Sequence, residues 1–167
     1  GSDPAGARGP GSVGRAAQAE QVAQVAEVPG HVDAGVQPPL GREAVGDRAF
    51  VSGSIGPTGK LLAPLGDLDP AAARAGFARQ AAALAEAGAD LLCVETMTDL
   101  AEAELAVRAA RAAAPGLPVV ATMSFEATRR GFFTVMGASP KVAAVRLEAA
   151  GASVVGANCG DGDTMAG

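Results

Sequence analysis

Residues 69–96, DPAAARAGFARQAAALAEAGADLLCVET, decide the fold because they hold one complete helix followed by one strand. Asp69 is a good N-cap and Pro70 suits the first helical turn, whereas Gly88 is the residue type that commonly follows the last turn of a helix. The short apolar run at residues 90–94, DLLCV, then predicts a buried strand. This stretch therefore predicts one helix-strand unit.

The same alternation continues on both sides of this unit. Asp99, with Glu102 three residues later, predicts a capped helix over residues 100–114, and PVVATMSF at residues 118–125 predicts the next strand. The other predicted elements are a helix that begins at Ser139 and Pro140 and ends at Gly151, and strands at residues 49–54 and 153–158. Alternating strands and helices predict an α/β fold with a parallel sheet. Because the strands are apolar on both faces, we expect helices to cover the sheet.

Two stretches with a similar pattern point to a functional edge of this sheet. EAGADLLCVET at residues 86–96 and EAAGASVVGANC at residues 148–159 both run from a helix end through Ala-Gly-Ala and a strand to polar or reactive groups. In parallel α/β sheets and barrels, chemistry collects at the carboxyl ends of the strands. The sequence therefore predicts one rim that carries Ser54, Glu95, Thr96, Ser124, Asn158 and Cys159.

The stretch VSGSIGPTGK, residues 51–60, is only superficially similar to a phosphate-binding loop. That motif needs four residues between its glycines and a hydroxyl residue after the lysine. Here five residues separate Gly53 from Gly59, and Leu61 follows Lys60. We therefore interpret the stretch as a strand that ends in a turn.

The bulk composition excludes several classes of function. The 167 residues are 49% hydrophobic, which suits one domain with a buried core. A formal net charge of −5 and the lack of a basic cluster longer than Arg129-Arg130 argue against nucleic acid as a partner. No run approaches the roughly 20 apolar residues of a membrane span, and the start lacks the apolar core of a signal peptide. We expect a cytoplasmic protein with no membrane partner.

Residues 1–41 differ in character from the rest of the chain. Positions 1–39 contain no Leu, Ile, Phe, Met, Trp or Tyr, so they cannot bury enough apolar surface to offset the entropy of ordering. We expect this segment to be disordered or translated out of frame, which resequencing of the coding DNA would decide. The chain's one histidine, His31, lies here and is not expected to be catalytic, so a Ser-His-Asp triad is not predicted.

Cys159 and Glu95 are the candidate functional residues. Cys159 directly follows a strand, and the nearby Gly156 and Gly160 leave its thiol room for a ligand; the alternative is a small buried apolar role. Glu95 ends an apolar strand, where an unpaired carboxylate is costly to bury, so it either reaches solvent or binds a cationic group such as an amine. Cys93 is expected in the core. The helix charges are expected to form a solvated outer face: Glu86, Glu102, Glu104, Arg108 and Arg111.

Four motifs together resemble the homocysteine S-methyltransferase family, and most of all its cobalamin-dependent methionine synthase branch. They are GSIGPTGKLLAPLG (53–66), ETMTDLAEAELAV (95–107), TMSFEATRRGFFTVMGASP (122–140) and VVGANCGDG (154–162). The resemblance runs from about Arg42 to Gly167 and leaves out residues 1–41.

The resemblance implies a partial (β/α)8 TIM barrel with about four of its eight βα units, in which residues 42–167 are the central part of a homocysteine-binding methyltransferase. It also implies a zinc ion on three cysteine thiolates, of which Cys159 is the first. Glu95 would hold the amine of homocysteine, with Asn158 beside the ligand. Homocysteine would bind zinc as a thiolate and take a methyl group to give methionine. Cobalamin on another domain or protein is a candidate methyl carrier.

Two departures from the family limit this expectation. The other two zinc cysteines belong to a Gly-Gly-Cys-Cys motif on a later strand, which does not occur before Gly167, and Cys93 has the wrong position to replace them. The second departure is that only about four of the eight strands are present, and an open half-barrel exposes strand edges, which invites aggregation or pairing. We therefore expect this polypeptide to be a catalytically incomplete fragment.

Three alternatives stay open. The first is a related corrinoid-linked methyltransferase that uses another thiol or donor, since fold alone does not fix the substrate. The second is a non-catalytic truncated product that does not fold by itself, which a missing cooperative melt would indicate. The third is an α/β binding domain whose nucleotide affinity depends on Lys60.

Overall fold

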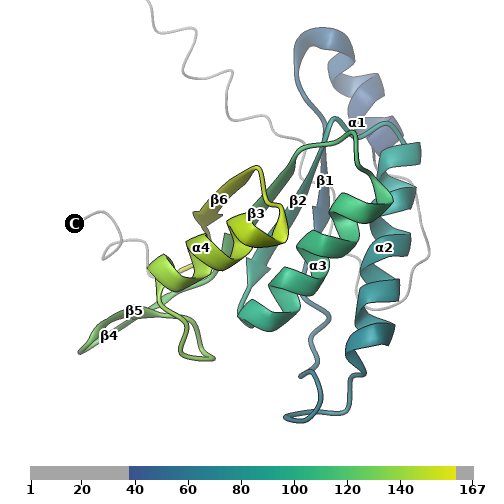
Figure 1. Cartoon of the computed structure of the whole chain (residues 1–167). Helices are drawn as coiled ribbons and strands as arrows, with labels where there is room; N and C mark the ends of the chain where they lie inside the picture. Colours follow the sequence, from purple (N-terminus) through teal and green to yellow (C-terminus); the bar gives the residue numbers. More distant parts are fainter. Residues whose placement is uncertain (1–37, 161–167) are drawn as a thin grey trace, which may run out of the picture.

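The computed structural model describes residues 38–160 (Figure 1). In chain order its elements are α1 (Pro38–Val45), the 3-10 helix η2 (Gly46–Arg48), β1 (Ser52–Ile55), α2 (Pro70–Glu86), β2 (Leu91–Met97), α3 (Leu100–Ala113), β3 (Val119–Met123), β4 (Glu126–Thr128), β5 (Gly131–Phe133), α4 (Pro140–Ala150) and β6 (Val154–Ala157). The expectations for residues 1–37, His31 included, lie outside the described residues. Residues 38–41 belong to α1, which begins before the boundary expected near residue 42.

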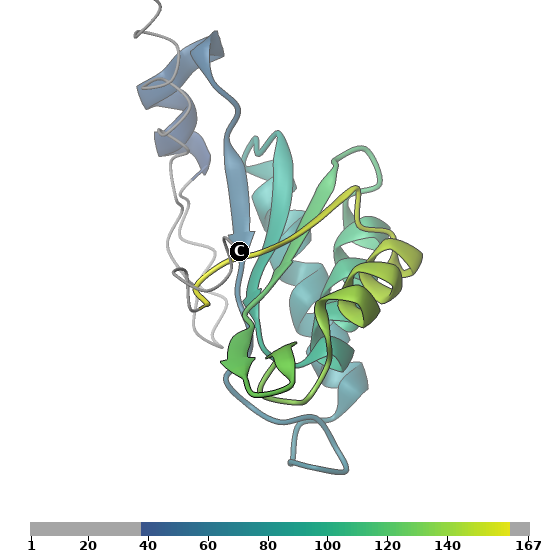
Figure 2. The same cartoon turned by 90° about the vertical axis from the view of Figure 1, so that its left-hand side faces the viewer.

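The predicted parallel sheet is confirmed. Strands β1, β2, β3 and β6 pair in that order and in parallel, so each βα unit adds the next strand at the same edge. Helices α2, α3 and α4 all lie on one face of this sheet (Figures 1 and 2), so the expected cover is found on that face only. Right-handed crossovers in one direction place successive helices on the same side. Over residues 38–160 the sheet is open, which agrees with a partial (β/α)8 barrel.

The two faces of the sheet differ in chemistry. In β2, Leu92 and Val94 are fully buried in the core that α2 and α3 cover, whereas Cys93 and Glu95 alternate with them and are half-buried. Because successive side chains in a strand point to opposite faces, Cys93 and Glu95 lie on the face away from the helices. One face packs the core, and the other carries the candidate chemistry.

The predicted helix ends are confirmed by their capping contacts. Asp69, Asp99 and Ser139 each accept a hydrogen bond from a backbone N–H in the first turn of the helix that follows. Gly88 and Gly151 follow α2 and α4 with φ of 89° and 110°, the left-handed region that favours glycine. The local signals in the sequence therefore fix these helices.

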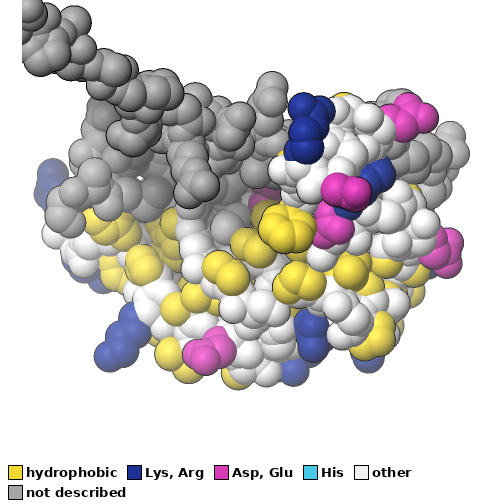
Figure 3. Space-filling view, turned by 90° about the horizontal axis from the view of Figure 1, so that it is seen from above, with side chains coloured by type: hydrophobic (Ala, Val, Ile, Leu, Met, Phe, Trp, Pro, Cys, Tyr) yellow, Lys and Arg dark blue, Asp and Glu magenta, His cyan; other side chains and the backbone are white. Residues whose placement is uncertain are grey.

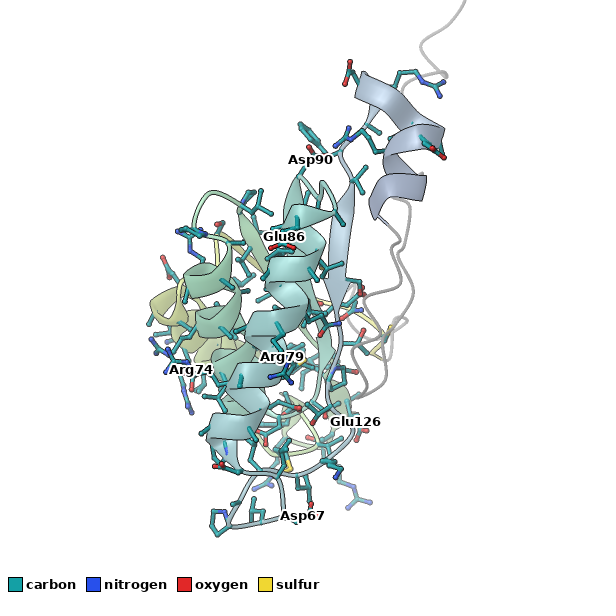
Figure 4. All side chains as sticks on the ribbon, turned by 90° about the vertical axis from the view of Figure 1, so that its right-hand side faces the viewer. Asp67, Arg74, Arg79, Glu86, Asp90 and Glu126 are labelled. Atoms are coloured by element: carbon teal, nitrogen blue, oxygen red, sulfur yellow. The ribbon has the colours of Figure 1, made fainter. Side chains whose placement is uncertain are left out.

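An ion pair that the sequence did not predict ties α1 to the sheet. Arg42 binds Asp90, which also accepts a hydrogen bond of 2.6 Å from the Val51 backbone N–H. These contacts, the Val51 hydrogen bond first, hold the pKa of Asp90 below its usual value despite the opposing effect of burial. Figure 4 shows Asp90 at the end of the sheet nearest α1.

The surface agrees in part with the expected charge pattern. Arg74, Arg79 and Glu86 lie along the exposed side of α2 (Figure 4). On the face in Figure 3, basic and acidic side chains are interspersed with hydrophobic ones, without a patch of one sign. None of the helices in the described part of the chain is long and apolar enough to cross a membrane.

Candidate functional site

The carboxyl ends of the parallel strands bring the predicted rim residues together. Ser54 lies in β1, Glu95 and Thr96 near the end of β2, and Asn158 and Cys159 directly after β6. The Ser54 hydroxyl donates a hydrogen bond of 2.6 Å to Glu95 Oε1. The predicted rim therefore exists, and its first link joins β1 to β2.

Asn158 links the other strand ends. Its Oδ1 accepts hydrogen bonds from the Thr96 backbone N–H at 3.1 Å and from the Thr122 hydroxyl at 2.8 Å. Its Nδ2 donates to Thr96 Oγ1 at 2.7 Å and to Cys159 Sγ at 3.5 Å. The contact between Thr96 and Asn158 spans 62 positions of sequence, so it depends on the fold.

These contacts determine what Asn158 can do chemically. A backbone N–H can only donate, so the atom facing Thr96 N must be the amide oxygen, and the orientation of the amide follows. An amide offers two donor hydrogens and two acceptor lone pairs, and all four are in use here. Asn158 thus links the ends of β2, β3 and β6, and its place beside a ligand stays a prediction.

Two rim residues have an unfavourable backbone conformation. Thr96 and Cys159 have φ of 59° and 53°, in the left-handed region that β-branched and other non-glycine residues rarely adopt. Such conformations cost about 1–3 kcal/mol each and cluster at active sites and ligand clamps. The Thr96 conformation coincides with a break in the β2–β3 register between Val94 and Met97. Both outliers lie in the network around Asn158, which marks this rim as the candidate site.

Cys159 presents an exposed thiol at this rim. Its backbone carbonyl accepts a hydrogen bond of 3.2 Å from the Ser124 hydroxyl, and its Sγ lies 3.9 Å from Thr96 Oγ1. The alternative of a buried apolar role is therefore wrong, and the thiol is open to a ligand.

Cys93 has a different environment. Burial raises the pKa of its thiol to about 11, and the negative charge of Glu95 adds to the effect. It is half-buried on the face away from the helices, and not in the core as expected. A thiol with this pKa is protonated at neutral pH and is a poor nucleophile or metal ligand.

We therefore expect the two cysteines to differ in reactivity. At pH 8, roughly one part in a thousand of Cys93 is thiolate, so iodoacetamide should modify Cys159 first. Modification of Cys93 should become faster as the pH rises toward 11. Peptide mapping by mass spectrometry measures both rates, and equal rates at pH 8 would contradict this assignment.

Glu102 is the one helix charge whose predicted location is clearly wrong. The sequence placed it on a solvated face, as a capping partner of Asp99, but it is 3% exposed. Its carboxylate accepts hydrogen bonds from Thr58, in the turn after β1. The spacing pattern could not reveal this contact because Thr58 lies 44 positions away.

The described residues supply part of a metal site at most. Over residues 38–160, no three His, Cys, Asp or Glu side chains come together in a way that could hold a metal ion. The Cys159 thiol fits zinc by its chemistry, since zinc binds thiolates, but a zinc site needs further ligands. An apolar pocket of about 360 Å³ between α4 and β6, lined by Phe125 and Phe132 among others, has no charged lining and includes none of the predicted rim residues.

Comparisons with known proteins concern the family and the fold of the chain. The family model for homocysteine S-methyltransferase matches residues 14–167, which extends the similarity into the segment that was expected to lie outside it. A methionine synthase from Mycobacterium tuberculosis (strain ATCC 25618 / H37Rv) is 32% identical over 119 residues, or 69% of this chain and 10% of that protein. The chain thus spans about a tenth of the length of this curated relative.

A solved structure shows the same fold. The crystal structure of the homocysteine methyltransferase MmuM from Escherichia coli, in its apo form, matches with a TM-score of 0.52. The match is 24% identical and covers 72% of this chain and 42% of that chain. At this identity the likeness concerns the fold alone.

Proposed function

Because the chain belongs to the homocysteine S-methyltransferase family, we propose that it takes part in transfer of a methyl group to the zinc-activated thiol of homocysteine, which gives methionine. The observation that carries this proposal is the rim network. Thr96 and Asn158 join the strand end that bears Glu95 to the loop that bears Cys159. A carboxylate and a thiol on one rim suit an amino acid that carries both an amine and a sulfur.

Glu95 is proposed to bind the amine of homocysteine. It is half-buried, and within residues 38–160 its carboxylate accepts a hydrogen bond from the Ser54 hydroxyl. A carboxylate that accepts from a cationic N–H makes a shorter and stronger hydrogen bond than a neutral acceptor does. Ser54 would keep the carboxylate turned toward the rim while the amine occupies its remaining lone pairs.

Cys159 is proposed as a zinc ligand, with the other ligands outside the described residues. Bound zinc lowers the pKa of a coordinated thiol, so that the thiolate of homocysteine is present at neutral pH. This chain's own contribution is to hold the Cys159 sulfur in place beside the substrate, through the Nδ2 hydrogen bond of Asn158. The methyl group leaves its donor as the new S–C bond to homocysteine forms.

Residues 42–167 are proposed as the central part of a methyltransferase barrel, in a cytoplasmic protein. Cobalamin on another domain or protein is proposed as the methyl carrier, because the motifs are most similar to the cobalamin-dependent branch.

A thiol screen tests the proposed function. The full-length gene product, supplied with zinc and with methylcobalamin or a methyl sulfonium donor, should form methionine from homocysteine and leave cysteine unmethylated. Chromatography with mass detection measures both products. Methylation of another thiol in preference to homocysteine would overturn the proposed substrate and support the related methyltransferase.

A further inference from the structure

Glu102 is a buried carboxylate that the proposed chemistry does not use. It lies in the first turn of α3 and is 3% exposed. Burying a carboxylate is costly unless hydrogen bonds or an opposite charge compensate. The ion pairs recorded within residues 38–160, Arg42 with Asp90 and Glu104 with Arg146, do not include it. Hydrogen bonds must therefore account for its place in the fold.

Those hydrogen bonds all come from one turn. The Thr58 backbone N–H donates to Glu102 Oε1 at 2.9 Å, and the Thr58 hydroxyl donates to the same oxygen at 2.5 Å. The Lys60 N–H in turn donates to Thr58 Oγ1 at 3.3 Å. Residues 56–60, GPTGK, which we name the GPTGK turn, are thus fixed to α3 through one carboxylate oxygen.

The GPTGK turn lies at the candidate site. It follows β1 directly at the carboxyl end of the strand, and Ile55 of β1 pairs with Val94 of β2. Two carboxylates, one in β2 and one in α3, therefore accept hydrogen bonds from two hydroxyls, one in β1 and one in the turn that follows it. Glu95 accepts from Ser54, and Glu102 accepts from Thr58. Glu95 is half-buried, so that a ligand can reach its carboxylate, whereas Glu102 is enclosed.

We propose that Glu102 is a positioning residue that holds the GPTGK turn against the rim, next to the site where Glu95 would bind the amine of homocysteine. The identity of the ligand rests on the proposed function, whereas the contact between Glu102 and the GPTGK turn does not. Loss of the Glu102 carboxylate frees the turn, and a free turn leaves one wall of the amine site unformed.

Trypsin cleavage after Lys60 measures how firmly the turn is held. Lys60 is exposed, and cleavage of a loop tracks the population of its open form. Glu102→Ala should raise the cleavage rate roughly tenfold or more, because hydrogen bonds to a charged group are lost. Glu102→Gln, which keeps an acceptor oxygen, should give a smaller increase. Glu104→Ala, a change on the same helix, is the matched control and should leave the rate unchanged.

A second pair of variants keeps the test valid if Glu102→Ala does not fold. Thr58→Ala removes the hydroxyl from the half-buried turn, and Thr58→Ser retains it, so only Thr58→Ala should speed cleavage after Lys60. Cleavage after Arg79, within α2, is the internal reference, since global unfolding would raise both rates together. A Lys60 rate that is unchanged in Glu102→Ala and in Thr58→Ala, or that rises only together with the Arg79 rate, would overturn the proposal.

Measurements with homocysteine test whether the GPTGK turn supports the substrate site, separately from whether the protein acts on homocysteine at all. In the full-length protein, Glu102→Ala should raise the KM for homocysteine several-fold and leave kcat within about twofold, because binding and not chemistry is disturbed. Faster cleavage with an unchanged KM would overturn the positioning role at the substrate site. Absence of homocysteine binding by the unaltered protein would overturn the proposed function, while the cleavage rates would still decide whether Glu102 holds the turn.

Discussion

Replacing Cys159 with serine is expected to lower the zinc affinity of the full-length protein by more than 100-fold. Loss of a contact outside the ligand shell already costs roughly 10- to 100-fold in metal affinity, and a direct thiolate ligand contributes more. Serine keeps the size of the side chain but offers no thiolate at neutral pH. Competition with a chromophoric zinc chelator measures the affinity.

The second cysteine provides the matched control for this prediction. Cys93 lies within β2 and has a pKa of about 11, so Cys93→Ser should leave zinc affinity unchanged. Circular dichroism of both variants checks that the fold persists. If zinc affinity survives in Cys159→Ser or falls only in Cys93→Ser, Cys159 is not the ligand.

Replacing Glu95 with glutamine is expected to raise the KM for homocysteine roughly 10- to 150-fold. This range corresponds to the 1.5–3 kcal/mol that a hydrogen bond to a charged group contributes. Glutamine still offers an oxygen to the Ser54 hydroxyl, so the link between β1 and β2 is kept while the negative charge is lost. Initial rates at varied homocysteine concentration measure the change.

Glu126→Gln is the control for the loss of charge, since Glu126 is exposed on β4 and takes no part in the hydrogen bonds around Asn158. Its KM should equal that of the unaltered protein. A KM that changes equally in both variants would mean that overall charge, and not the amine site, explains the effect. An unchanged KM in Glu95→Gln would remove Glu95 from the site.

The helices and strands could be predicted because their signals are local. Asp69 and Ser139 cap α2 and α4 by accepting hydrogen bonds from the first turn of each helix. Gly88 and Gly151 follow these helices in the left-handed conformation that favours glycine. Strand ends were also predictable, since parallel strands must place their carboxyl ends together. The short hairpin of β4 and β5 was not predicted, because its strands have three residues each and are mostly exposed.

The details of the site could not be predicted, because they depend on contacts between distant positions. The pattern of Asp99 and Glu102 is that of a capping pair, yet Asp99 alone caps α3 while Glu102 binds Thr58. The left-handed conformation of Thr96 has no signal in the sequence, since a β-branched residue disfavours it. The use of all four hydrogen-bonding positions of Asn158 likewise follows only from the register of β2, β3 and β6.

Glu95 and Cys159 are proposed to bind one substrate at one rim of the sheet. A crystal structure of the full-length protein with zinc and homocysteine, with anomalous data collected at the zinc edge, tests this proposal most directly. We expect a zinc peak about 2.3 Å from Cys159 Sγ, the homocysteine sulfur on the same ion and the homocysteine amine on Glu95. Zinc bound away from Cys159, or homocysteine bound away from Glu95, would contradict this proposal.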